Sequence, residues 1–224
     1  MTGISAEDLQ KLKRRHRRDL RAAHARGLMQ GILSLLQPGD VVVDCGANLG
    51  TITGPLAETG ALVHAFEPDP YSFARLVDLF ADHPNVTLHN AAVGVTEGRI
   101  QLMRAANWED NPDLASVKST VISGGRKIEE AGGSAIEVAL IDFPAFLDGL
   151  KARHGTIAFL KMDIEGAELD LLEEMDRRNQ FTDIRLTVAE THEHKFKDLR
   201  PRFEALRARI TANHPITRVN LDWI

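Results

Sequence analysis

Ionisable side chains recur at every second position in two segments of the second half of the chain. Lys161, Asp163 and Glu165 alternate in the first segment, and Glu190 and His192 alternate in the second. Residues two apart in an extended chain point to the same side, so each segment presents its groups together. Carboxylates and imidazoles transfer protons near neutral pH. We therefore expect Asp163 to position or deprotonate a substrate, and we place His192, Glu165 and Lys161 beside it as catalytic candidates.

The same residues also allow other interpretations. Lys161 and Glu165 could form a structural ion pair, and histidines after a strand are often only exposed loop residues. Carboxylate and imidazole also suit Mg²⁺, Mn²⁺ or Zn²⁺, so Asp163, Glu190 and His192 form an alternative metal site. The spacing is not the His-Glu-x-x-His of metalloproteases, and we predict no metal as a resident cofactor.

A glycine-rich turn follows a short β-branched run earlier in the chain. Residues 41–50 read Val-Val-Val-Asp-Cys-Gly-Ala-Asn-Leu-Gly. Glycines let a backbone turn tightly and approach a ligand closely, and asparagine tolerates the left-handed conformation. We expect Gly46, Asn48 and Gly50 to form a cofactor turn. Asp44, at the end of the strand, could anchor a ligand ammonium group directly or through water.

Two further signals stand at the ends of the next strands. Glu67 lies 23 residues after Asp44 and ends the run Leu62–Phe66. An acid at about this distance in a β-α-β unit accepts hydrogen bonds from ribose hydroxyls. Asn90 and Ala91 follow the next strand, where they could meet an adenine edge, although an asparagine there is also an ordinary turn residue.

The turn favours one cofactor over another. Dinucleotide-binding loops usually read Gly-x-Gly-x-x-Gly around a pyrophosphate. Here the run from Gly46 is Gly-Ala-Asn-Leu-Gly, and Asp44 precedes it by two residues. A carboxylate suits a cationic sulfonium amino acid, so we predict S-adenosylmethionine and not NAD.

The composition is that of an ordinary globular protein. The chain has 224 residues, 43% of them hydrophobic, and a formal net charge of -5. This mild acidity gives no reason to expect nucleic acid or an anionic membrane as partner. Cys45 is the only cysteine, which excludes an internal disulfide and a thiolate zinc cluster. No apolar run has the length of a membrane span, and no signal peptide is evident, so we expect a cytoplasmic protein.

Strand and helix patterns alternate through most of the chain. They predict an α/β fold with parallel strands joined by right-handed crossovers. Residues 1–38 form a basic arm of two helical stretches, the second at 28–36, and residues 11–26 hold eight Lys or Arg and one acid, Asp19. Residues 39–224 form the main domain, with a loop and hairpin insertion at about 94–141 whose short strands we expect at 99–103 and 136–141. We expect a last strand at 216–221. The arm is either a solvated helix packed on the domain edge or a surface for an anionic partner.

The segment from Phe159 to Glu168, Phe-Leu-Lys-Met-Asp-Ile-Glu-Gly-Ala-Glu, adds a more specific pattern. Together with the glycine turn, Phe66-Glu67-Pro68, Asn-Ala-Ala-Val-Gly at 90–94 and Glu-Thr-His at 190–192, it closely resembles the FkbM family of methyltransferases. The resemblance covers about residues 41–192 and includes neither the basic arm nor the C-terminal tail.

This resemblance implies a Rossmann-like class I methyltransferase fold. It implies a seven-stranded, mostly parallel sheet with helices on both faces and an antiparallel last strand. It also implies S-adenosylmethionine-dependent methyl transfer to oxygen on a small molecule, such as a sugar or natural product. Trp108, in the long middle loop, could stack on a sugar ring or could equally anchor the loop itself.

Two other functions stay open from the sequence. The arm could bring RNA, a protein or a carrier-linked anionic substrate to the enzyme, or the chain could bind the cofactor without transferring its methyl group. The acceptor's identity, the oligomeric state and any metal dependence are not fixed by these patterns.

Overall fold

The computed structural model describes residues 5–104, 135–193 and 196–223. The strands are β1 (Val41–Cys45), β2 (Leu62–Phe66), β3 (Val86–His89), β4 (Ala92–Gly94), β5 (Gly98–Met103), β6 (Ala135–Asp142), β7 (Ile157–Met162), β8 (Ile184–Ala189) and β9 (Val219–Asn220). The helices are α1 (Ala6–Leu35), α2 (Thr53–Glu58), α3 (Pro70–Leu79), α5 (Phe143–His154), α6 (Glu168–Arg177) and α7 (Arg200–Asn213), with short 3₁₀ turns η2 (Gln180–Asp183) and η3 (Lys197–Leu199).

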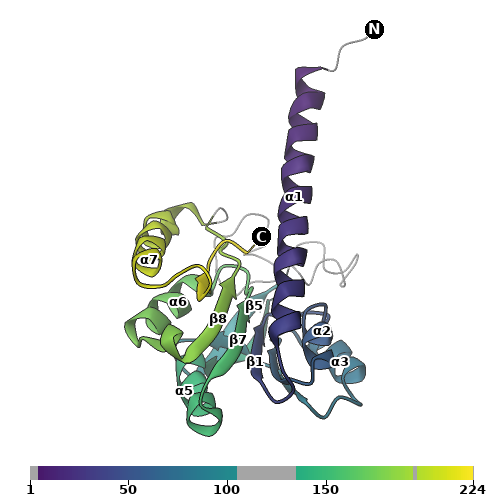
Figure 1. Ribbon diagram of the computed structural model, residues 1–224, viewed down its shortest axis with the longest axis vertical. Helices are drawn as coiled ribbons and strands as arrows, with labels where there is room; N and C mark the ends of the chain where they lie inside the picture. The colour runs from purple at the N-terminus through teal and green to yellow at the C-terminus, as the bar shows by residue number, and fades with distance from the viewer. Residues whose placement is uncertain (1–4, 105–134, 194–195, 224) are drawn as a thin grey trace.

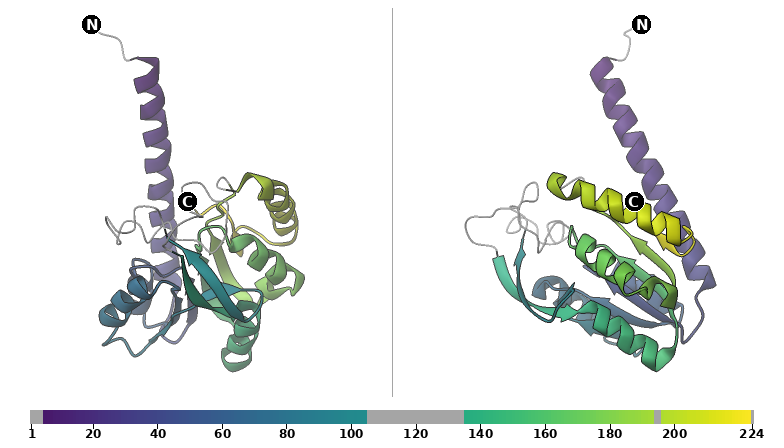
Figure 2. Two further views of the ribbon diagram at one scale, coloured as in Figure 1. Left: turned by 180° about the vertical axis from the view of Figure 1, so that it is seen from behind. Right: turned by 90° about the vertical axis from the view of Figure 1, so that its left-hand side faces the viewer.

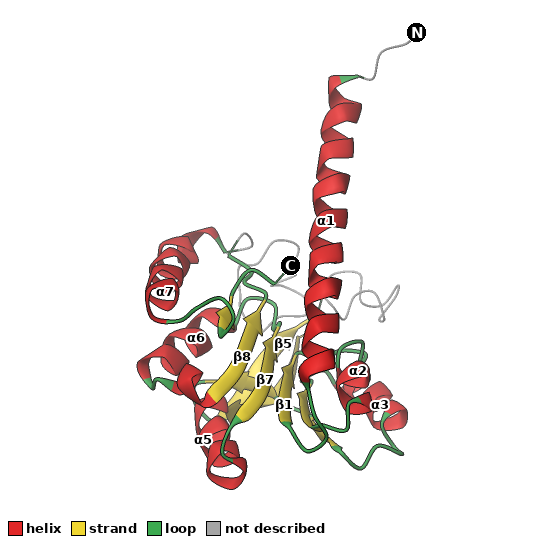
Figure 3. Cartoon of the chain, in the orientation of Figure 1, coloured by secondary structure: helices red, strands yellow, loops and turns green. Residues whose placement is uncertain are grey.

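Six strands form the central sheet, in the order β3-β2-β1-β7-β8-β9. Strands β1, β7 and β8 lie side by side in Figure 3. Every neighbouring pair is parallel. Parallel sheets are covered on both faces, so their central strands are apolar throughout, and all residues of β1 and β7 are buried. The strand order reverses between β1 and β7. Ligands of open α/β sheets bind at this reversal, beyond the carboxyl ends of the strands.

Helices cover both faces of the sheet, as predicted (Figure 2). The side chains of β1 alternate between two cores. Val41 and Val43 pack with residues of α5, α6 and α7. Val42 packs with residues of α1, α2 and α3. This alternation is the two-residue period of a strand, and it fixes which loops meet at the carboxyl edge.

The predicted α/β class and mostly parallel sheet are confirmed, but the seven strands and the antiparallel last strand are wrong. In the described residues the sheet has six strands, and β9 pairs parallel to β8 through Thr187 and Val219. The expected strand at 216–221 shortens to two residues because Arg218 and Val219 donate hydrogen bonds back to Pro215 in a turn. One antiparallel bridge, between Glu190 and Asp222, follows it.

A second, three-stranded sheet has the order β4-β6-β5. Strands β5 and β6 are antiparallel, with Gly98 opposite Leu140 and Met103 opposite Ala135. They coincide with the two short strands that the sequence indicates at 99–103 and 136–141. The loop between them, including Trp108, lies outside the described residues.

The N-terminal arm is one continuous helix, where the sequence indicates two helical stretches. Its C-terminal half packs on the domain through Ala25, Met29, Ile32 and the following Leu36, which recur at helical spacing. Its N-terminal half is exposed and projects from the body (Figure 1). Among the described residues no helix combines the length and apolarity that crossing a bilayer requires.

Candidate active site

The glycine turn after β1 is held against the exits of two neighbouring strands. The backbone N–H groups of Gly46 and Ala47 both donate to the Phe66 carbonyl, at 3.0 and 2.9 Å. Gly46 has φ +79°, and a Cβ there would lie 1.9 Å from the Asp163 carbonyl oxygen. Asn48 adopts the left-handed conformation with φ 49°, which agrees with its predicted place in the turn.

Lys161 stabilises this turn by hydrogen bonds to its backbone carbonyls. Its buried ammonium group lies 2.7 Å from the Gly46 carbonyl, 3.2 Å from the Cys45 carbonyl and 3.1 Å from Asp44 Oδ1. Burial lowers the pKa of Lys161, but the charges of Asp44 and Asp163 raise it more, so the net shift is upward. The structural ion pair that the sequence suggested for Lys161 is therefore formed with Asp44, where Glu165 was the suggested partner.

Asp44 has partners within the protein. Its side chain is fully buried, and Oδ2 accepts a 2.7 Å hydrogen bond from the Thr53 hydroxyl at the start of α2. Lys161 supplies the cationic partner that we expected from a ligand. The printed contacts of Asp44 are thus with Thr53 and Lys161, and its anchoring of a ligand ammonium group stays a prediction.

Glu67 lies beside the turn at the end of β2. Its two oxygens accept hydrogen bonds from the backbone N–H groups of Asn48 and Asp69, each at 2.8 Å. Burial raises the pKa of Glu67 to about 7, against the lowering effect of these two bonds. Each carboxylate oxygen has a second lone pair. The site thus fits a ligand with two hydroxyl donors, as the ribose of S-adenosylmethionine has.

The remaining predicted cofactor residues have identifiable contacts. Asn90 donates its amide to the carbonyls of Glu67 and Pro68, at 2.9 and 3.2 Å, and so holds the loop that carries Glu67. Ala91 is buried next to it. Gly50 faces away from the turn, since a Cβ there would meet Leu79 at 2.9 Å on α3. Their cofactor contacts stay predictions.

The two segments with alternating ionisable residues lie next to each other because they follow β7 and β8, which are neighbours in the sheet. His192 is buried, and its Nε2 lies 3.6 Å from Glu165, 3.6 Å from Glu190 and 3.9 Å from Asp163. Asp163 also lies 4.0 Å from the Lys161 ammonium. The structure therefore gathers all four predicted catalytic side chains at the carboxyl edge, next to Gly46.

Glu168 is a residue of this cluster that sequence reasoning missed. It is fully buried at the start of α6, and its Oε1 lies 2.9 Å from His192 Nδ1. The same oxygen accepts the N–H groups of Ile164 and Gly166, at 3.0 and 3.1 Å. We assign the ring proton to Nδ1, because an oxygen that already accepts two N–H groups acts as an acceptor towards the imidazole as well. The sequence held a sign of this role, because Glu168 is the last acid of the Lys-x-Asp-x-Glu-Gly-Ala-Glu segment that carries the family resemblance.

The cluster also has the composition of a cation site. Asp163, Glu165 and His192 can each offer one ligand atom, and these atoms lie within 4.8 Å of one another. This possible metal site has Glu165 as its third ligand, whereas the alternative metal site suggested by the sequence had Glu190. A carboxylate behind a ligating histidine, as Glu168 is here, is common in metal sites. The absence of a resident metal stays a prediction.

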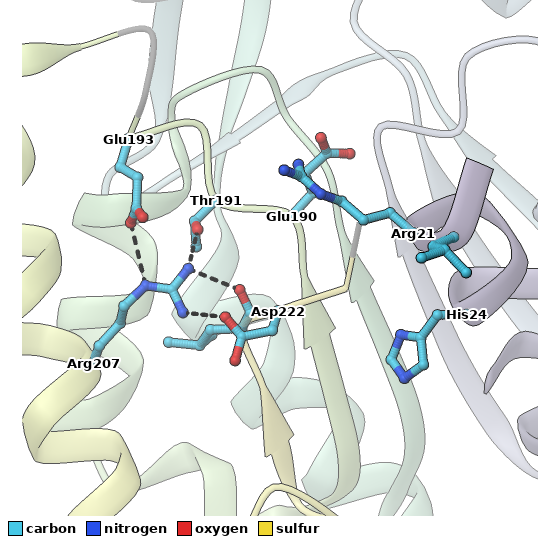
Figure 4. Close-up of a pocket in the computed structure, with 9 residues that line it drawn as sticks. Arg21, His24, Glu190, Thr191, Glu193, Arg207 and Asp222 are labelled. Carbon is cyan, nitrogen blue, oxygen red and sulfur yellow. Dashed lines mark hydrogen bonds and ion pairs between the residues drawn. The ribbon is translucent and has the colours of Figure 1, made fainter. Parts of the chain in front are cut away.

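A pocket of about 770 Å³ opens next to this cluster. One wall is α1, with Leu20, Arg21 and His24, and the other is formed by the segments after β8 and β9 (Figure 4). Arg207 of α7 crosses that second wall and bonds to Glu193, Asp222, Thr191 and the Leu221 carbonyl. Glu190 lines the pocket and its carboxylate lies 3.6 Å from His192 Nε2, so this residue belongs to both the pocket wall and the cluster.

Comparison with known proteins decides the family. The family model described as the methyltransferase FkbM domain matches residues 44–214. The chain belongs to the FkbM methyltransferase family. It is therefore an S-adenosylmethionine-dependent methyltransferase, and the resemblance seen in its sequence is confirmed.

Individual relatives agree with this assignment. This FkbM-family chain is 30% identical over 186 residues to 31-O-demethyl-FK506 methyltransferase FkbM of Streptomyces tacrolimicus, covering 70% of this chain and 67% of that protein. It is 47% identical over 53 residues to ribosomal RNA small subunit methyltransferase A of Thermotoga neapolitana, which is 24% of this chain and 20% of that one.

Solved methyltransferase structures show weaker likeness. A putative rRNA methylase from Clostridium thermocellum has 18% identity and a TM-score of 0.27, covering 50% of this chain and 92% of its own. A putative methyltransferase from an antibiotic biosynthesis pathway of Anabaena variabilis has 15% identity and a TM-score of 0.25, covering 83% and 85%. These scores are low, and the assignment depends on the family match.

Replacing Gly46 by alanine should test the packing of the turn. The new Cβ would collide with the Asp163 backbone and strain a positive φ, so we expect a loss of about 2–4 kcal/mol in the free energy of unfolding. Urea denaturation followed by circular dichroism measures this loss. Gly54→Ala is the matched control, since nothing lies within 4 Å of a Cβ there and the residue is helical. Equal stability of the two variants would contradict the described turn.

Proposed function

We propose that this protein transfers the methyl group of S-adenosylmethionine to a hydroxyl group of a sugar or natural-product small molecule. The observation that carries this proposal is the buried Glu168–His192 pair, which faces three carboxylates between the glycine turn and the pocket. The curated relative of Streptomyces tacrolimicus, named for a 31-O-demethyl substrate, supports an oxygen acceptor.

The residues around the glycine turn would hold the cofactor. Glu67 would accept the ribose hydroxyls, while Asn90 and Ala91 border the adenine side. Gly46 and Asn48 allow close approach of the backbone, which Asp44 and Lys161 fix from behind. When bound, S-adenosylmethionine supplies an electrophilic methyl group on its sulfonium.

His192 is the general base in this proposal. Its Nδ1 proton is held by Glu168, so Nε2 can take the proton of an acceptor hydroxyl. Asp163 and Glu165 would accept hydrogen bonds from neighbouring hydroxyl groups of the acceptor and so orient it towards His192. The carboxylates around Nε2 favour the protonated imidazole that results, because opposite charges a few ångströms apart attract strongly in a partly buried site.

The affinity for S-adenosylhomocysteine should depend on pH through Glu67. Its pKa of about 7 means that the carboxylate, which accepts both ribose hydroxyls, forms only as the pH rises through 7. We expect the Kd to fall about tenfold from pH 6 to pH 8 by calorimetry. In Glu67→Gln the affinity should be lower and nearly constant over this range. The same pH dependence in the variant as in the wild type would remove Glu67 from the site.

Turnover should separate the roles of His192 and Glu168. With a methyl acceptor found by screening, we expect His192→Asn to lower kcat about 100-fold or more, with the Kd for S-adenosylhomocysteine within twofold of wild type.

Glu168→Gln should lower kcat about tenfold with little change in KM, because it weakens the hold on Nδ1. The ¹⁵N shifts of His192 should then show a mixture of tautomers, where the wild type shows the Nδ1–H form. Glu173→Gln, on the same helix, is the control and should change neither readout. Wild-type turnover in His192→Asn would show that another group is the base.

A further inference from the structure

One face of α1 carries a basic stripe that runs into the pocket. Arg14, Arg17, Arg21 and His24 follow one another at intervals of three, four and three residues, so they share one side of the helix. Arg21 and His24, at its inner end, line the pocket (Figure 4). From Arg14 to His24 the stripe is about 15 Å long, at a rise of 1.5 Å per residue.

The positive charge of the pocket region is concentrated on this wall. In the part of the chain that the structure describes, Arg14, Arg17 and Arg21 form no ion pair. Arg207, on the opposite wall, is already paired with Glu193 and Asp222. An anionic group that enters the pocket would therefore meet its available cations on α1.

We infer that the acceptor is a sugar that carries a phosphate or diphosphate group, with the charged group on the Arg14–Arg17–Arg21–His24 stripe. This inference rests on the proposed function. The acceptor hydroxyl would lie at His192 Nε2, which is 3.6 Å from Glu190, a residue that lines the pocket. Arginine side chains bind phosphate oxygens in paired hydrogen bonds, and the pocket volume is that of a typical small-molecule site.

The charge distribution favours a small anion over a nucleic acid. Residues 11–26 hold eight of the 27 Lys and Arg of the chain but only one of its 32 Asp and Glu, so the rest of the chain is strongly acidic. Acidic side chains, Glu190, Glu193 and Asp222, also border the pocket. A long polyanion would be repelled by this surface, whereas a phosphate or diphosphate needs only the stripe.

Calorimetry with two probes, inorganic pyrophosphate and UDP-glucose, tests the inference. Each probe is titrated into the full chain saturated with S-adenosylhomocysteine, at low and moderate salt. We compare the wild type with the double variant Arg17→Gln/Arg21→Gln. The matched control is Arg15→Gln/Arg26→Gln, which removes the same charge from the opposite side of α1.

We expect both probes to bind the wild type, the stripe variant to bind about tenfold or more weakly, and the control to stay within twofold. The absence of binding to the wild type would overturn the inference, as would equal losses in both variants. Binding of a single-stranded RNA in preference to both probes would also overturn it. Because S-adenosylhomocysteine binding is measured in the same samples, its absence would count separately, against the proposed function.

Discussion

The buried ammonium group of Lys161 is the contact on which the site depends. It joins the carbonyls of Cys45 and Gly46 to the carboxylate of Asp44, and so locks the end of β1 to β7. Removing one partner of such a buried pair commonly costs about 3–5 kcal/mol, because the other charge is left without compensation. The glycine turn, where we propose that the cofactor binds, is thus shaped by an interaction within the protein.

A second buried polar contact, between Glu168 and His192, fixes the part of the site where we propose that the methyl acceptor binds. One carboxylate oxygen receives two backbone N–H groups and the imidazole, so the loop after β7 and the loop after β8 are fixed together. Glu165, in this loop, adopts a left-handed φ of 58°, a conformation that costs energy in a residue with a side chain. The contacts of Lys161 and of Glu168 thus hold the ends of β7 and β8 in place, and Asp163 lies there between the Gly46 turn and His192.

The sequence was sufficient for the features that are local. The β-α rhythm gave the parallel sheet, and the position of Glu67 after β2 followed from its distance to Asp44. The sequence could not predict contacts between residues that are far apart along the chain. Lys161 reaches Cys45 over a separation of 116 residues, and no spacing rule connects the two. The shortness of β9 was likewise not predictable, because hydrogen bonds from Arg218 and Val219 to Pro215 form a turn in the first part of the strand expected at 216–221.

The most direct test of the account is a crystal structure of the complex with S-adenosylhomocysteine. We predict that its ribose hydroxyls bond to Glu67, and that its sulfur lies on the side of the Gly46 turn that faces Asp163 and His192. In the complex with S-adenosylmethionine, the methyl group to be transferred from that sulfur would then lie next to the proposed base. A ribose bound away from Glu67, or a sulfur on the side remote from His192, would contradict the assignment of both halves of the site.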